Sequence, residues 1–197
     1  MYSITKRIFD ILSAIIVLVL LIPVFVILSI WILLDSKGGV FYSQIRVGKN
    51  GKLFKLHKFR SMRQNAEASG QLTIGNDNRV TKSGKFIRKT KLDEFPQLIN
   101  IIKGEMSIVG PRPEVPRYVD LYTPDQRRVL SVKPGLTDLA SLEFISEQEI
   151  LGKSNNPEKV YIEEIMPKKL ELNLRYIDTM NFWLDIKLIF NTIRKIV

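Results

Sequence analysis

The sequence predicts a mainly α-helical α+β fold, in which a hydrophobic N-terminal helix precedes a polar domain with a small β-hairpin. Three observations predict it: an uncharged run from Ile11 to Leu34, an alternating segment around Asn50-Gly51, and amphipathic stretches at helical spacing in the C-terminal half. A chain of 197 residues is long enough for one domain with its own core. We therefore expect a membrane-anchoring helix over residues 1–36 and one folded domain over residues 37–197.

The N-terminal run contains 24 residues without a charge, and as a helix it would extend about 36 Å, enough to cross a hydrocarbon core. Pro23, at its middle, removes a backbone hydrogen bond and predicts a kink or break. Lys6 and Arg7 favour a cytoplasmic N-terminus. Two interpretations remain open on the residues alone: a spanning helix with a tolerated proline, or a broken, re-entrant helix that enters and leaves the membrane by one face.

Charge is unevenly distributed along the chain. Between Lys37 and Lys103 there are 15 lysine and arginine residues against four acids, whereas Asp138 to Glu171 holds four lysines against eight acids. The basic half predicts a polyanionic partner, which could be nucleic acid, anionic lipid headgroups or a diphosphate. The chain has no cysteine, which excludes disulfides and thiolate metal sites.

The basic half begins with a predicted hairpin that has Asn50-Gly51 at its tip, a pair typical of primed turns. Its lysines are interpreted either as a solvated strand face or as contacts with anionic headgroups. His57, the single histidine, is interpreted as structural. The polar segment from Gln64 to Lys85 predicts a long exposed loop, and Arg88 ends a series of cations spaced by three residues that are either solvated or phosphate-binding.

Residues 88–113 carry the strongest functional signal. Pro96 is tolerated in a first helical turn, so a helix is predicted to begin near Leu92–Glu94 and to end at Gly104. Asp93 and Glu94 are then acids of a helix N-terminus, which is their unremarkable interpretation. Because adjacent helical residues point about 100° apart, the two carboxylates could instead divide the labour, one attacking and one holding a metal. Arg112, held between two prolines, is suited to phosphate recognition.

In a series of short motifs, the chain resembles the bacterial sugar transferases, monotopic phosphoglycosyl transferases that use polyprenol phosphate as acceptor. No single motif is decisive, but their order along the chain is highly specific. The motifs are Lys6-Arg7-x-x-Asp10, Gln44-x-Arg46-x-Gly48, Lys58-Phe59-Arg60-Ser61-Met62, Leu92-Asp93-Glu94-Phe95-Pro96-Gln97-Leu98, Gly104-Glu105-Met106-Ser107, Gly110-Pro111-Arg112-Pro113 and Lys133-Pro134-Gly135.

The resemblance implies a reaction and roles for four residues. A UDP-sugar would give its sugar 1-phosphate to polyprenol (undecaprenyl) phosphate, leaving UMP and a polyprenol-diphosphate sugar that starts an exopolysaccharide, capsule, O-antigen or glycoprotein glycan. Asp93 matches the nucleophile, which forms a phosphosugar intermediate in ping-pong kinetics, and Glu94 matches the ligand of Mg²⁺. Arg112 and, more weakly, Arg88 match phosphate-binding positions.

The resemblance also implies a place for the enzyme. The N-terminal element would be a re-entrant helix broken at Pro23, in contact with membrane lipid, with the active site on the cytoplasmic face of the bacterial inner membrane. Downstream glycosyltransferases and a second copy of the chain are possible partners. The segment after Gly135 departs from the common Gly-x-Thr-Gly-x-x-Gln pattern at Asp138 and Ser141, so the identity of the sugar is left open.

A last helix capped by Asn181 is predicted to lie either at the membrane interface or in the core of the domain.

Two hypotheses from other classes compete with the transferase. A membrane-tethered nucleic-acid-binding protein would use the basic segment, but the chain has no recognisable nucleic-acid motif and its aromatic residues are not interleaved with the basic ones, so we expect no nucleic-acid partner. A membrane phosphohydrolase would use the same aspartate and metal, and would release free sugar phosphate.

Overall fold

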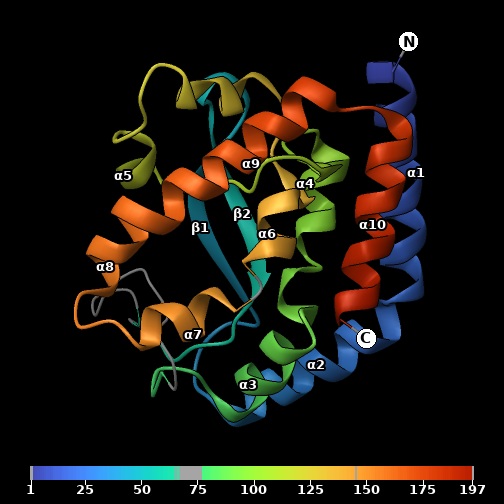
Figure 1. Cartoon of the computed structure of the whole chain (residues 1–197). Coiled ribbons are helices and arrows are strands. Elements are labelled where there is room, and N and C mark those ends of the chain that lie inside the picture. Colours follow the sequence, from blue (N-terminus) through green and yellow to red (C-terminus); the bar gives the residue numbers. More distant parts are fainter. Residues whose placement is uncertain (1, 65, 67–76, 145, 197) are drawn as a thin grey trace.

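The computed structural model describes residues 2–64, 66, 77–144 and 146–196 of the chain. It is mainly helical, as the sequence predicts, with two small two-stranded sheets, of which the sequence predicts the hairpin (Figure 1). The helices are α1 (Tyr2–Leu20), α2 (Ile22–Asp35), α3 (Lys82–Lys89), α4 (Gln97–Lys103), α5 (Pro116–Val119), α6 (Leu139–Glu143), α7 (Glu147–Gly152), α8 (Pro157–Val160), α9 (Met166–Thr179) and α10 (Phe182–Ile196). The strands are β1 (Phe41–Val47), β2 (Leu53–Phe59), β3 (Ser107–Val109) and β4 (Gly135–Thr137). Short 3₁₀ segments are η1 (Lys49–Gly51), η3 (Leu92–Glu94) and η4 (Gln126–Ser131), and η5 (Tyr161–Ile165) is a π-helical segment.

The hydrophobic run forms two helices. Helices α1 and α2 meet at an angle of 61°, and Pro23 lies in the first turn of α2, so the predicted break is confirmed. In the part of the chain that the structure describes, no single helix has the length and apolar character needed to cross a membrane, while the bent pair does by length and composition.

The start of α1 is fastened to the rest of the domain by its polar residues. The Arg7 guanidinium donates to the Ile101 and Ile102 carbonyls, at 2.7 and 3.0 Å, and so caps the C-terminus of α4. Asp10 is buried and accepts hydrogen bonds from the Ser107 hydroxyl and the Ile108 N–H of β3. The Lys-Arg-x-x-Asp motif therefore attaches α1 to the domain.

The end of α2 is fastened to the same domain. Arg60, which follows β2, donates to the Lys37 carbonyl and, at 2.8 Å, to the Ser36 carbonyl. The Asp35 carboxylate accepts from the Ser83 N–H and hydroxyl at 2.7 and 2.8 Å, at the start of α3. Both ends of the bent pair are thus bound to one body, and Figure 1 shows α1 and α2 (blue) following two of its edges.

The predicted hairpin is confirmed. Strands β1 and β2 pair antiparallel, with Val47 opposite Leu53, and Asn50 and Gly51 take the positive φ values of 56° and 76° that a primed turn requires. Phe59 is buried against α2 and α3. The His57 Nδ1 lies 3.0 Å from the Ser43 hydroxyl across the hairpin, which agrees with the structural role predicted for it.

Two predictions between the hairpin and β3 are corrected. The predicted loop from Gln64 to Lys85 ends earlier, because α3 begins at Lys82 with the Thr81 side chain as its cap; residues 67–76 of that loop lie outside the described residues. The helix predicted to begin near Leu92 begins at Gln97, and Leu92–Glu94 forms the separate turn η3. Lys91, which precedes η3, has a φ of 57°. Pro96 has no N–H to donate to the Leu92 carbonyl, which accepts instead from the Phe95 N–H in a tighter i→i+3 bond, so the α-helical pattern starts only at Gln97. Gly104 ends α4 at a φ of 88°, as predicted.

The second sheet was not predicted from the sequence. Strands β3 and β4 are only three residues each and pair in parallel, too short for a detectable alternation. Their ends cross closely at two glycines: a Cβ on Gly135 would lie 2.1 Å from the Gly110 nitrogen, so neither position accepts a side chain. The close crossing fixes the Gly-Pro-Arg-Pro turn, since the Gly110 N–H donates to the Thr137 carbonyl and the Gly135 N–H donates to the Pro111 carbonyl.

The C-terminal half wraps helices around the hairpin. Helical spacing over Tyr118–Val132, with Pro124 near a helix start, predicts a helix there; the structure has the short α5, which ends at Val119, and the 3₁₀ turn η4, which begins at Gln126 just after Pro124. The amphipathic helix predicted over Tyr161–Tyr176, with Pro167 interrupting it, is present as η5 and α9, and Pro167 lies in the first turn of α9. Asn181 caps α10 as predicted, accepting from the Leu184 N–H at 3.0 Å. Helix α10 buries Leu188, so the predicted core packing is present, and it exposes Trp183, Phe190 and Ile193, while the predicted interfacial role stays a prediction.

Candidate active site

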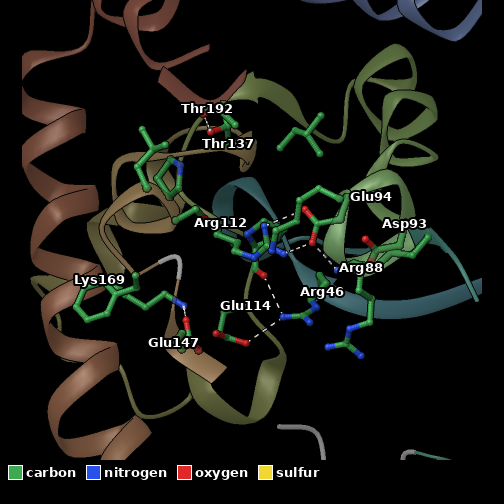
Figure 2. A pocket seen from close by; sticks show the side chains of 18 of the residues that line it. Arg46, Arg88, Asp93, Glu94, Arg112, Glu114, Thr137, Glu147, Lys169 and Thr192 are labelled. Atoms are coloured by element: carbon green, nitrogen blue, oxygen red, sulfur yellow. Dashed lines mark hydrogen bonds and ion pairs between the residues drawn. The ribbon is translucent and has the colours of Figure 1, made fainter. Parts of the chain in front are cut away.

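A cavity of about 1010 Å³ collects the predicted site residues from separate parts of the chain (Figure 2). Arg88 comes from α3, Asp93 and Glu94 from η3, and Arg112 from the turn after β3, and all four line the cavity. The structure therefore brings together every residue for which the sequence predicted a catalytic or phosphate-binding role.

Glu94 is held by two cations. Its carboxylate accepts from both terminal nitrogens of Arg112 and from Lys58 Nζ at 2.9 Å, as the dashed lines to Arg112 in Figure 2 indicate. Burial opposes ionisation of this group, but the charges of Arg112 and Lys58 outweigh burial and hold the pKa of Glu94 well below its ordinary value. Glu94 is a permanent anion whose two oxygens are both engaged.

The carboxyl group of Asp93 lies in surroundings opposite to those of Glu94. The side chain is buried, with 8% of its surface exposed, and its Oδ1 has no hydrogen-bond partner among the described residues. Burial raises the pKa of the Asp93 carboxyl and the charge of Glu94 raises it further, against the lowering effect of Lys58, Arg88 and Lys91. An unpartnered buried carboxylate oxygen in a cavity is a costly feature for a fold and one that suits a nucleophile.

Arg88 is a cation of the site that has no protein partner among the described residues. It lines the cavity near Asp93, as Figure 2 shows, and it makes no hydrogen bond or ion pair with any other residue that the structure describes. A guanidinium without a protein partner beside a buried acid is available to an anionic ligand.

Arg112 is backed by a network that the sequence did not predict. Arg46, from β1, donates to the Pro113 carbonyl at 3.1 Å and to Glu114 Oε1 at 3.0 Å. The Tyr161 hydroxyl donates to the other oxygen of Glu114. The hairpin, the turn of Arg112 and η5 are therefore held in one arrangement by residues that all line the cavity.

Lys58 and Arg46 are the site residues that sequence reasoning missed. The hairpin lysines were interpreted as solvated or at lipid headgroups, but Lys58 faces the cavity, and burial lowers the pKa of its ammonium group, partly offset by Glu94. Both residues lie in the motifs Lys58-Phe59-Arg60-Ser61-Met62 and Gln44-x-Arg46-x-Gly48. The signal was their presence in those motifs, since their charge does not distinguish them from the other hairpin cations.

The far wall of the cavity carries polar pairs. Lys169 and Glu147 form an ion pair at 2.9 Å, and the Thr137 and Thr192 hydroxyls lie 2.5 Å apart. The two unusual residues of the sequence, Asp138 and Ser141, also satisfy each other: Asp138 is buried at the start of α6 and accepts from the Ser141 N–H and hydroxyl at 2.9 and 2.6 Å. Their joint departure from the common pattern preserves a capped helix at the cavity edge.

The cavity offers few metal ligands of its own. Within the described residues, no group of three or more histidine, aspartate or glutamate side chains lies together in a way that would hold a metal. Asp93 and Glu94 still provide two adjacent carboxylates, one of them with an unpartnered buried oxygen. Mg²⁺ binds through one or two carboxylates when substrate phosphates supply further oxygens, so this donor set fits Mg²⁺ together with a phosphorylated ligand.

Comparison with known proteins gives this geometry its context. The model of the family described as bacterial sugar transferase matches residues 1–197. The chain belongs to the bacterial sugar transferase family. It is 37% identical to a protein of Bacillus subtilis named uncharacterized sugar transferase EpsL, over 98% of this chain and 88% of that protein.

Two longer relatives carry named activities. The chain is 38% identical, over its full length, to a UDP-N-acetylgalactosamine-undecaprenyl-phosphate N-acetylgalactosaminephosphotransferase of Aeromonas hydrophila, of which it covers 44%. It is 39% identical, over 96% of its length, to a UDP-glucose:undecaprenyl-phosphate glucose-1-phosphate transferase of Escherichia coli, of which it covers 39%. The chain thus spans less than half of these two family members, and they use different sugars.

Proposed function

We propose that this protein transfers sugar 1-phosphate from a UDP-sugar to undecaprenyl phosphate, releasing UMP and forming an undecaprenyl-diphosphate sugar. Family membership over the whole chain supports the reaction class, because relatives that match over nearly all of this chain are named for that reaction. The site supports it as well, since the cations Lys58, Arg88 and Arg112 line the same cavity as Asp93 and Glu94, and such a cluster is suited to a diphosphate.

The contrast between Asp93 and Glu94 is the observation that carries the mechanism. In the proposed first step, the Asp93 carboxylate attacks the sugar-linked phosphorus, the bond from that phosphorus to the oxygen of UMP breaks, and UMP leaves with the electron pair. In the second, an oxygen of the acceptor phosphate attacks the same phosphorus, and the bond to Asp93 breaks and restores the carboxylate. The free Oδ1 of Asp93 supports this assignment, because a nucleophile must not be engaged by the protein.

The cations around the acids stabilise the charge that moves. Most catalysis of phosphoryl transfer comes from positioning and from offsetting the charge on the equatorial oxygens. Arg88 has no hydrogen-bond or ion-pair partner among the described residues, so we assign it to the transferring phosphate. Arg112 is turned toward Glu94, which fixes its guanidinium at the site before substrate arrives, and the Glu114–Arg46 network holds the turn that carries it.

Mg²⁺ is the cofactor that we propose, with Glu94 as its ligand and Asp93 beside it. When bound, it would neutralise charge on the donor's phosphate oxygens. Because both oxygens of Glu94 accept from Arg112 and Lys58, we expect the ion to bind together with the donor diphosphate rather than before it.

The test is a screen of UDP-sugars with undecaprenyl phosphate, with two products measured. The proposal predicts UMP and a lipid-linked sugar diphosphate in equal amounts, with one or a few donors preferred. Release of free sugar phosphate would instead indicate a phosphohydrolase. Absence of turnover with every donor, together with tight nucleic-acid binding, would contradict the proposal.

We also propose that α1 and α2 form a re-entrant membrane anchor, with the domain of residues 37–197 as the catalytic unit on the cytoplasmic face of the bacterial inner membrane. Three features support it: the 61° bend at Pro23, the attachment of both ends of the pair to one domain, and the exposed apolar faces of both helices. Single cysteines in place of Ser3 and Ser36, in a chain that has none, should react with an impermeant label from the same side. Labelling from opposite sides would establish a spanning helix.

A further inference from the structure

The cavity of the candidate active site has an apolar arm that the chemistry of phosphoryl transfer does not use. It runs between α1 and α10, and its floor is formed by β3, β4 and α4. The residues that line this arm are Ser13 and Val17 of α1, Ile189, Thr192 and Ile193 of α10, and Leu98, Ile108 and Leu136 of the floor.

Polar and aromatic contacts join helices α1 and α10 near their N-terminal ends. Lys6 and the buried Asp185 form an ion pair at 2.6 Å, and the Phe9 and Phe182 rings meet edge to face at 5.5 Å. In Figure 1 the two helices run side by side, α1 in blue and α10 in red. Beyond the contact of Phe9, the facing residues of both helices line the cavity rather than close it.

The apolar arm is continuous with the reacting centre. Phe95 directly follows Glu94 and packs, together with Val17 and Leu136, against the buried cluster that contains Leu98. An apolar surface therefore leads from the acids of η3 to the side of α1.

The outer rims of the arm are apolar as well. On α1, Leu12 and Ile16 are 56% and 58% exposed, and on α10, Phe190 and Ile193 are 64% and 56% exposed. Exposed apolar residues on both rims of an apolar groove indicate that the groove opens toward hydrocarbon rather than toward water.

We propose that this groove, between α1 and α10, binds the isoprenyl chain of the acceptor and guides its phosphate to Asp93. The proposal rests on the proposed function, which supplies an acceptor that is a phosphate attached to a long hydrocarbon. The other substrate, a UDP-sugar, is polar throughout and has no part that would gain from an apolar groove. The cations at one end and the hydrocarbon surface at the other match the two ends of the acceptor.

The ping-pong reaction allows the groove to be tested apart from the rest of the site. Ser13→Phe and Ile193→Trp narrow the groove from its two walls. Ile15→Phe and Trp183→Phe are matched controls, because they change residues of the same helices that are exposed, do not line the cavity and lie outside its rims. Because the two groove variants lie on different helices, the test can still be made if one of them fails to fold.

In each variant, UMP release in a single turnover without acceptor measures donor chemistry, and decay of the phosphosugar enzyme measures acceptor chemistry. The decay is followed with undecaprenyl phosphate and with geranyl phosphate, whose chain is too short to fill the groove. We expect both groove variants to slow the decay with undecaprenyl phosphate by about tenfold or more, the effect of losing a few buried methylene contacts. UMP release and the decay with geranyl phosphate should change by less than about twofold.

The outcomes separate the two proposals. Equal slowing with the long and the short acceptor, or equal slowing in the outer-face controls, would overturn the groove and indicate general membrane contact. Failure of the wild-type enzyme to release UMP or to form the intermediate would overturn the proposed function instead. As a second measurement, an isoprenyl phosphate with a photoreactive end should crosslink to α1 and α10 residues of the groove; crosslinking confined to α2 or α3 would contradict it.

Discussion

The two sides of the η3 turn present the same functional group in opposite surroundings. Glu94 lies between Arg112 and Lys58, and its pKa is held well below the ordinary value. Asp93, one residue earlier, is buried with an unpartnered oxygen, and its pKa is raised. The difference shows that two adjacent acids can have different functions. Glu94 holds the cations Arg112 and Lys58 in place, and Asp93 keeps an oxygen available to the substrate.

The largest effect is expected at Asp93. Asp93→Asn should lower turnover by about 10³-fold or more, because the nucleophile is lost. The same variant should unfold at a higher temperature than wild type at neutral pH, because a buried carboxylate that ionises unfavourably is replaced by a neutral group. Turnover and thermal unfolding are measured beside Asp120→Asn, which changes an exposed acid and should alter neither. A lower unfolding temperature for Asp93→Asn than for wild type would contradict the proposed contrast between Asp93 and Glu94.

Glu94→Gln should lower both activity and stability. It leaves Arg112 and Lys58 without their shared anion, and we expect turnover to fall by about 10²- to 10³-fold and the free energy of unfolding to fall by about 2 kcal/mol. Denaturant titration measures the second quantity and a titration of activity with Mg²⁺ tests the proposed ligand. Unaltered Mg²⁺ dependence would remove Glu94 as the ligand.

Substitutions of the two arginines should differ in their effect on stability, as those of the two acids do. Arg88→Ala should lower the rate of UMP release by about tenfold to a hundredfold with little change in unfolding free energy, less than about 0.5 kcal/mol, because Arg88 has no partner in the described structure. Arg112→Ala should lower both, since it also breaks the pair with Glu94. Arg175→Ala, on the exposed face of α9, is the control for loss of a surface cation. Equal destabilisation by Arg88→Ala and Arg112→Ala would contradict the assignment.

A smaller effect is expected in the pH dependence. Because the pKa of Asp93 is raised in the folded state, the protonated form contributes stability below the unfolded pKa, and that contribution is lost as pH rises through the folded pKa. The unfolding temperature of Asp93→Asn should therefore exceed that of wild type by a margin that grows from about pH 4 to pH 7. The rate of intermediate formation should fall on acidification at a higher pH than an ordinary aspartate would give. A constant margin across this range would exclude a raised pKa.

The sequence predicted the parts of the fold that local patterns encode. The break at Pro23, the Asn50-Gly51 hairpin, the end of α4 at Gly104 and the cap at Asn181 each depend on a few neighbouring residues, and all are confirmed. The helix predicted to begin near Leu92 begins at Gln97, because Pro96 lacks the N–H that would continue α-helical hydrogen bonding through η3.

The site was predicted in its residues but not in its contacts. Asp93, Glu94, Arg88 and Arg112 line one cavity as expected, yet the partners of Glu94 and Arg112 come from the hairpin and from η5. Lys58 and Arg46 differ from the other hairpin cations only in facing inward, which depends on register and packing between distant segments. Likewise the parallel pair of β3 and β4 is held by Gly110 and Gly135, which lie far apart in sequence.

The central claim is that Asp93 carries the sugar phosphate between the two substrates, and mass spectrometry of the trapped enzyme tests it most directly. After incubation with a preferred UDP-sugar and no acceptor, the protein should gain the mass of one sugar phosphate, and peptide mapping should locate the gain at Asp93. Addition of undecaprenyl phosphate should remove it. An adduct located at another residue, or one formed with unchanged yield by Asp93→Asn, would contradict the account.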